Sequence, residues 1–171
     1  MVSSRSKQSQ TYLITFTCYG TRLHGDEKGA VDRHHNLPGS RSLPLDEPQL
    51  ALEGCLMREG RYNLDERRRA VVLASLREVC AYRGRELLAA HVRTSHAHAV
   101  VSAAASPEQV MNDFKAYASR SLNRAEPNEL HRRRWTRHGS TQYLWKRGDV
   151  ASAIEYVVRE QGWVLAVYEK Q

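Results

Sequence analysis

The first residues whose types and spacing could do chemistry are His96 and His98, in the stretch from Ala90 to Val101. If this stretch is a strand, its side chains alternate between two faces, so both imidazoles point to one side and Ala97 points to the other. Two imidazoles directed at one point can hold a divalent metal ion. The chain has eight histidines, so a His-x-His pattern can arise by chance. On spacing alone, the simpler interpretation is that one histidine lies in the core and the other on the surface.

A second candidate pair, Tyr156 and Glu160, lies near the C-terminus. Asp149 as an N-cap and Gly162 as a stop signal predict a helix over 150–161. Residues four apart lie one above the other on a helix, so the phenol and the carboxylate share a face. Taken alone, the pair is better explained as a tyrosine at the edge of the core beside a solvated glutamate.

The elements that must position these residues follow from patterning and from start and stop signals. The predicted order is strand, helix, strand, strand, helix, strand, helix, after a polar tail over 1–10 and with a long loop over 20–48. This order is typical of an α+β fold, a ferredoxin-like split βαβ sandwich with a four-stranded antiparallel sheet, helices on one face and an extra C-terminal helix. We expect one domain over 1–171. The predicted strands are 11–18, 86–94, 96–102 and 140–146, and the predicted helices are 49–59, 65–83, one beginning at Ser106-Pro107, and 150–161.

Composition narrows the class of protein. The formal net charge of +7 favours a polyanionic partner such as nucleic acid. No apolar run approaches the ~20 residues that span a bilayer, and the first ten residues lack a signal-peptide core. The three widely spaced cysteines, Cys18, Cys55 and Cys80, are predicted to be reduced core thiols in a cytoplasmic protein.

A basic segment with one aromatic residue runs from His131 to His138. Its guanidinium groups have the chemistry to neutralise phosphates, and its indole can stack on a base. A solvated linker explains the same segment equally well. The candidate DNA contacts in it are Arg132, Arg133, Arg134, Trp135 and Arg137.

Taken together, these residues resemble the HUH single-tyrosine transposases of insertion sequences and their relatives associated with repetitive extragenic palindromes. The similarity rests on the order of elements, on His96-Ala97-His98, on the late helix with Tyr156, and on the runs Tyr19–Asp26 and Gly139–Trp145. The chain departs from the family pattern in three places. Ala97 is smaller than the usual aliphatic residue, Arg93-Thr94-Ser95 replaces the common Met-Pro-Asn, and Glu160 followed by Gln161 stands where relatives have Gln or Asn.

The resemblance implies a metal-dependent single-strand DNA endonuclease and strand transferase that acts through a covalent 5′-phosphotyrosine. Tyr156 would be the nucleophile, and His96, His98 and Glu160, or Gln161 in place of Glu160, would hold Mg²⁺ or Mn²⁺. Lys115 joins the candidate contacts to single-stranded or hairpin DNA. The family implies a homodimer or a monomer, in the cytoplasm and at the nucleoid when bound to DNA.

Two alternatives stay open at this point. A ferredoxin-like sheet can bind single-stranded nucleic acid without chemistry. A metal-dependent phosphoesterase would use water as its nucleophile. Of the seven other tyrosines, three lie in core-packed elements or on an apolar helix face and four lie on loops or strand ends, so Tyr156 is the preferred nucleophile.

Overall fold

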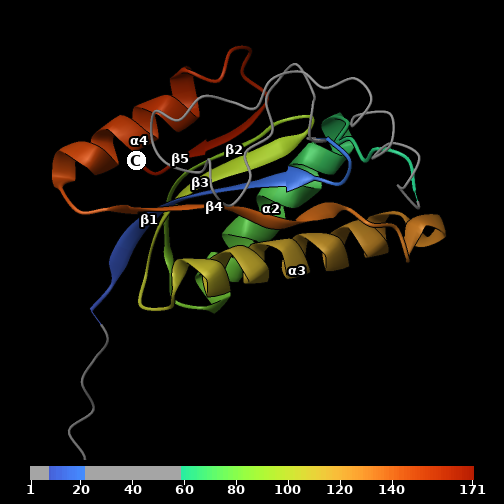
Figure 1. Cartoon of the computed structure of the whole chain (residues 1–171), viewed down its shortest axis with the longest axis horizontal. Coiled ribbons are helices and arrows are strands. Elements are labelled where there is room, and N and C mark those ends of the chain that lie inside the picture. The colour runs from blue at the N-terminus through green and yellow to red at the C-terminus, as the bar shows by residue number, and fades with distance from the viewer. Residues whose placement is uncertain (1–7, 22–58) are drawn as a thin grey trace, which may run out of the picture.

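The computed structural model describes residues 8–21 and 59–171, and in them the chain forms one antiparallel sheet with helices on both faces (Figure 1). The α+β class is confirmed. The predicted helix over 49–59 and nearly all of the loop over 20–48 lie outside the described residues. In chain order the elements are β1 (Gln10–Cys18), α2 (Glu66–Tyr82), β2 (Glu86–Val92), β3 (His96–Ala103), α3 (Pro107–Ala125), a 3-10 turn η1 (Pro127–Glu129), β4 (Trp135–Leu144), α4 (Arg147–Arg159) and β5 (Ala166–Glu169).

The sheet has the strand order β4-β1-β3-β2-β5, and each neighbouring pair is antiparallel. The prediction of four strands was wrong, because β5 adds an edge strand beside β2. A four-residue strand is too short to show a clear alternation in the sequence, and it forms here because β2 offers it a hydrogen-bonding edge. The β2–β3 hairpin is confirmed, with His96 as the first residue of its second arm.

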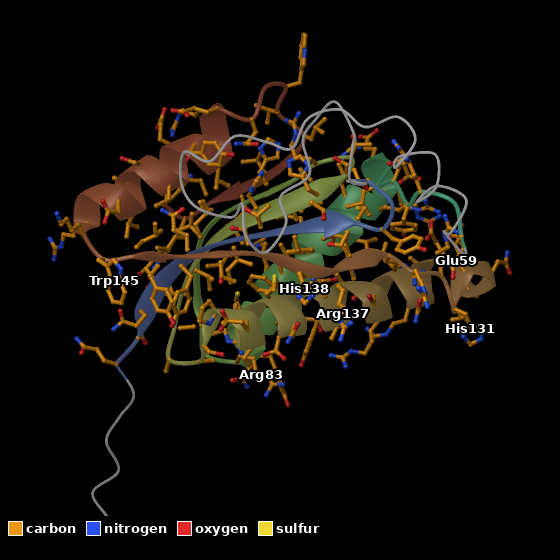
Figure 2. The ribbon with its side chains drawn as sticks, viewed as in Figure 1. Glu59, Arg83, His131, Arg137, His138 and Trp145 are labelled. Carbon is orange, nitrogen blue, oxygen red and sulfur yellow. The ribbon has the colours of Figure 1, made fainter. Side chains whose placement is uncertain are left out.

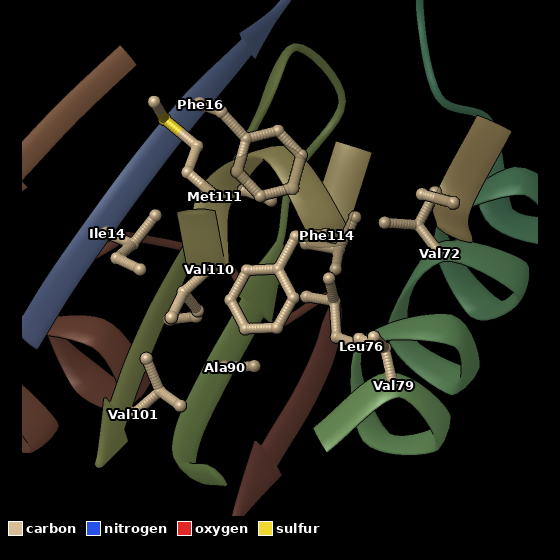
Figure 3. Close-up of a cluster of buried hydrophobic side chains, with 14 of the residues drawn as sticks. Ile14, Phe16, Val72, Leu76, Val79, Ala90, Val101, Val110, Met111 and Phe114 are labelled. Atoms are coloured by element: carbon tan, nitrogen blue, oxygen red, sulfur yellow. The ribbon is translucent and has the colours of Figure 1, made fainter. Parts of the chain in front are cut away.

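The main core lies between one face of the sheet and helices α2 and α3 (Figure 3). Apolar residues at alternate positions of β1 and β3 supply the sheet side of this core, and Val72, Leu76 and Phe114 supply much of the helix side. Helix α4 covers the opposite face, where Ala153 and Val157 pack with Ala89 and Val100 in a second, smaller cluster. The C-terminal helix is therefore separated by the sheet from the other two helices.

Two element boundaries differ from those that the sequence predicts. Strand β4 begins at Trp135 rather than Ser140, because Trp135 pairs with Cys18 and its ring packs edge-on against Phe16. Helix α4 begins at Arg147, and Asp149 is the third helical residue rather than the N-cap. The Asp149 carboxylate accepts a hydrogen bond from the Lys146 amide at 3.0 Å, so it still satisfies one amide at the start of the helix.

The two described cysteines fit the prediction of core thiols. Cys18 and Cys80 are free and buried, and burial raises the pKa of each thiol to about 12. Cys55 lies outside the described residues. None of the described helices is both long and apolar enough to cross a lipid bilayer.

Candidate functional site

The two histidines of β3 lie on the face of the sheet that α4 covers. Their rings are 4.8 Å apart, centroid to centroid, at an angle of 79°. Ala97, between them, is fully buried in the main core on the other face, so the predicted alternation is confirmed. His98 is only 5% exposed, and His96 is partly exposed. The pair is thus open to solvent mainly at the His96 end.

A hydroxyl group fixes one nitrogen of each imidazole. The Thr15 Oγ1 atom, on the neighbouring strand β1, lies 2.7 Å from His98 Nδ1. The Ser95 Oγ atom, in the hairpin turn, lies 3.0 Å from His96 Nδ1. When each hydroxyl accepts from Nδ1–H, the lone pair needed to bind a metal is on Nε2. Hydrogen bonds of this kind orient histidines that bind metals in proteins.

Tyr156 reaches the same place from α4. Helix α4 packs on the sheet through Ala153 and Val157, which turns the neighbouring Tyr156 toward the margin of the contact. The Tyr156 ring centroid lies 5.7 Å from that of His98 at 73°, an edge-to-face arrangement. The tyrosine is 40% exposed. The structure therefore brings together a partly exposed phenol and the histidine pair within one chain.

The third candidate ligand is less well defined. Helix α4 ends at Arg159, so Glu160 is its C-cap, with an exposed side chain and an amide that donates to the Tyr156 carbonyl at 3.2 Å. Gln161 turns back on the last helical turn, and its Nε2 donates to the same carbonyl at 3.3 Å. Among the described residues, no three or more His, Cys, Asp or Glu side chains gather closely enough to hold a metal. Glu160 and Gln161 thus stay alternatives.

The donor set at the histidine pair suits a divalent metal. Two adjacent imidazoles with a hydroxyl near each Nδ1 would supply two nitrogen ligands, and an amide or carboxylate oxygen from the end of α4 would be a third. Such a mixed nitrogen and oxygen set is compatible with Mn²⁺ or Mg²⁺.

The predicted DNA contacts separate into exposed and internal side chains. Arg133 and Arg137 are exposed. Arg132 is half-buried and donates to the Gly60 carbonyl at 2.7 Å, with its guanidinium 3.3 Å from the Glu59 carboxylate. Arg137 lies near the start of β4, at the opposite end of the strand from Trp145 (Figure 2).

Two of the predicted contacts, Arg134 and Lys115, lie inside the protein. Arg134 is 4% exposed and donates to Asn123 Oδ1 at 2.7 Å. Lys115 is 9% exposed, and its ammonium donates to the carbonyls of Thr136 and His138 at 3.0 Å. Burial lowers the pKa of Lys115 to about 8. Both side chains bond to residues around the start of β4, so we do not include them among the proposed DNA contacts.

The two tryptophans near the ends of β4 differ in exposure. Trp135 is partly buried and its Nε1 donates to Ser119 Oγ at 2.9 Å, so its ring is committed to the fold. Trp145 is 72% exposed and stacks on Tyr143, with centroids 5.0 Å apart and an interplanar angle of 9°. An exposed, stacked indole of this kind is the better surface for an unpaired base.

Three residues around the candidate site were missed in the sequence. Thr15 and Ser95 hold the imidazoles, and His91 is fully buried opposite His98 on the adjacent strand β2. A hairpin register counted back from His98 finds His91 only with a two-residue turn at Thr94-Ser95, whereas the predicted one-residue turn at Ser95 pairs His98 with Val92. The contact between Thr15 and His98 joins residues 83 apart, and nothing in the local sequence indicates it.

Comparison with known proteins gives two positive findings. The family model described as "Transposase IS200 like" matches residues 56–160, more than half of the chain. A solved structure titled "Structure of the REP associates tyrosine transposase bound to a REP hairpin" is similar with a TM-score of 0.50 and 10% sequence identity. The match covers 92% of this chain and 71% of that one, and at this identity it shows similarity of fold. No curated protein matches the sequence.

Proposed function

The chain belongs to the IS200-like transposase family, and on that premise we propose that it nicks and rejoins single strands of DNA through a covalent bond to Tyr156. Membership implies a nuclease activity connected with DNA transposition. The observation that supports this mechanism best is the partly exposed Tyr156 ring, 5.7 Å from the ring of His98 in the same chain. A nucleophile beside a candidate metal-binding pair is the arrangement that strand cleavage by transesterification needs.

In the proposed reaction the Tyr156 oxygen attacks the phosphorus of the scissile phosphodiester. The new P–O bond to tyrosine forms as the bond to the 3′-oxygen breaks in line with it. The phenol gives its proton to solvent, and the released 3′-oxygen takes one up as a hydroxyl. One phosphodiester bond replaces another, so the phosphotyrosine linkage retains the bond energy that rejoining requires. A second 3′-hydroxyl can then attack the phosphotyrosine and reverse the step.

His96 and His98, with Glu160 or Gln161, would hold the divalent metal, Mg²⁺ or Mn²⁺. When bound, such an ion polarises a non-bridging phosphate oxygen and offsets its charge. The protein's own residues orient the imidazoles and the phenol. Thr15 and Ser95 hold the imidazoles, and the packing of α4 on the sheet keeps the phenol beside them.

We propose single-stranded or hairpin DNA as the partner. The similar solved structure carries a REP hairpin by its title, and the net charge of +7 suits a polyanion. Arg133 and Arg137 are the preferred phosphate contacts because both are exposed, with Arg132 beside them, and Trp145 is the preferred stacking surface.

We also propose that the fold is of the ferredoxin-like split βαβ type. The order β4-β1-β3-β2 within the sheet, with α2 and α3 on one face, supports this assignment. Because Tyr156 meets His98 of its own chain, the proposed site needs no second copy, although a homodimer stays compatible with it.

The test is incubation of the protein with labelled single-stranded DNA that contains hairpins, in Mn²⁺ or in EDTA, followed by a denaturing gel. We expect a covalent protein–DNA band that needs the metal and disappears in Tyr156→Phe and in His98→Ala. Tyr82→Phe is the matched control, because Tyr82 is 73% exposed and lies at the end of α2, on the other side of the sheet. It should keep the band.

Other results would point to other functions. DNA binding without any adduct or cleavage favours a nucleic-acid-binding module. Cleavage that persists in Tyr156→Phe with no adduct favours a phosphoesterase that uses water. An adduct that persists in Tyr156→Phe means that another tyrosine is the nucleophile.

A further inference from the structure

His91 is a histidine that the proposed reaction leaves without a role. It lies on β2, directly opposite His98 of β3, and it is fully buried. Its cross-strand partner shows that it faces α4, on the same side of the sheet as the candidate site. A buried polar side chain normally has a hydrogen-bonding reason for its place.

One ring nitrogen of His91 contacts backbone in the last turn of α4, and the other contacts backbone just before β5. Nδ1 lies 2.9 Å from the carbonyl oxygen of Val157, and Nε2 lies 3.3 Å from the amide nitrogen of Leu165. An amide nitrogen can only donate, so Nε2 must be the acceptor and Nδ1–H donates to Val157. These contacts fix a neutral imidazole in one tautomer, and burial lowers its pKa in agreement with that state.

The Val157 carbonyl has a particular need for such a donor. Helix α4 ends at Arg159, and the last four carbonyls of a helix have no partner within the helix. His91 supplies the missing donor from the sheet below. At the same time it accepts from Leu165, which lies just before β5, so one side chain joins the last turn of α4 to the segment that follows it.

We propose that His91 is a positioning residue for the Tyr156 nucleophile. Tyr156 directly precedes Val157, so the hydrogen bond from His91 holds the backbone turn that carries the phenol. His91 also pairs with His98 across the sheet. It therefore fixes the position of the helical turn that carries the tyrosine relative to the strand that carries the histidine pair. This role rests on the proposed function, since it presumes that Tyr156 is the reacting group.

Three substitutions separate positioning from packing. His91→Leu fills the space but loses both hydrogen bonds. His91→Asn places an amide donor near the position of Nδ1, and His91→Gln reaches instead toward the position of Nε2. If the bond to Val157 is what holds Tyr156, His91→Asn should keep more activity than His91→Gln, and His91→Leu should keep least.

The measurement is the single-turnover rate of adduct formation on hairpin-containing single-stranded DNA with Mn²⁺, together with the Kd for the same DNA. We expect His91→Leu to slow the adduct step by roughly 10- to 100-fold with Kd changed less than about twofold, because a misplaced nucleophile loses rate rather than binding. His91→Asn should restore most of the rate. Val101→Ala is the matched control, since Val101 is buried on the opposite face, and it should lower Tm with little effect on the rate.

The outcomes are distinct. If wild-type protein binds DNA and forms no adduct, the proposed function fails and the role of His91 in it falls as well. If wild-type protein reacts and a folded His91→Leu reacts equally fast, the positioning role alone is overturned. Should His91→Leu not fold, the two polar variants decide, and equal rates in His91→Asn and His91→Gln overturn the proposal. Faster amide hydrogen exchange over 154–165 in His91→Leu than in Val101→Ala would support it.

Discussion

Thr15→Val tests whether the histidine pair is a metal site that β1 helps to build. The Thr15 hydroxyl lies 2.7 Å from His98 Nδ1, and valine keeps nearly the same shape while removing that oxygen. Thr15 is paired directly with His98 in the sheet, so the substitution leaves the strand contact itself in place. We therefore expect the effect to appear in metal binding more than in folding.

The magnitude follows from the role of such hydrogen bonds. Losing a group that orients a metal-binding histidine typically weakens metal binding by about 10- to 100-fold. At a Mn²⁺ concentration about 100 times the wild-type Kd, binding stabilises the native protein by about 2.7 kcal/mol. At the same concentration the Thr15→Val protein should gain only about 1.4 kcal/mol for a tenfold loss and about 0.4 kcal/mol for a hundredfold loss.

The assay is urea unfolding with and without Mn²⁺, which reads the metal independently of any activity. Thr15→Ser is the matched control, because it keeps the hydroxyl and should keep most of the Mn²⁺ gain. An equal Mn²⁺ gain in wild type and Thr15→Val would refute the idea that this hydroxyl orients a metal ligand. A wild-type protein that gains no stability from Mn²⁺ or Mg²⁺ would refute the metal site itself.

Two further substitutions test the packing of β4 in the sheet and against α3. Gly139→Ala should destabilise the protein by about 1–3 kcal/mol in urea unfolding, because a Cβ there would lie 2.5 Å from the backbone carbonyl oxygen of Thr15; an unchanged midpoint would contradict this close approach. Lys115 releases its proton near pH 8 in the fold but near 10.5 when unfolded, so its folded pKa is depressed and the unfolded chain binds more protons between these values. Stability should therefore rise by on the order of 2 kcal/mol from pH 7.5 to 9.5 relative to Lys115→Met, and parallel pH curves for the two proteins would count against it.

Much of the fold was predictable because its signals are local. The N-cap of α2 at Asp65 and that of α3 at Ser106 stand where the sequence indicates them, and each side chain accepts from a backbone amide of its own first turn. The alternation in β3 likewise follows from strand geometry alone. By contrast, β5 and the early start of β4 depend on pairing with segments far away in the chain, which no short window contains.

The basic segment shows why residue type does not decide exposure. Arg133 and Arg134 are neighbours of the same type, yet one is exposed and the other is 4% exposed with its guanidinium bound to Asn123. The difference arises because the chain enters β4 here and must bury one side of itself against α3. A buried charged side chain is tolerated more easily when it makes hydrogen bonds, as the two terminal nitrogens of Arg134 do.

By itself, then, the sequence determined which side chains share a face, since the periods of a strand and a helix are properties of the backbone. It put His96 and His98 together on one side of β3, and it put Tyr156 on a late helix that packs against a sheet. Only the tertiary structure decided that this helix covers the face with the histidines, with the Tyr156 ring beside His98, the Thr15 hydroxyl on His98 and His91 bonded to the Val157 carbonyl. That choice depends on the packing of segments more than 50 residues apart, and such packing is set by the whole chain rather than by any local pattern.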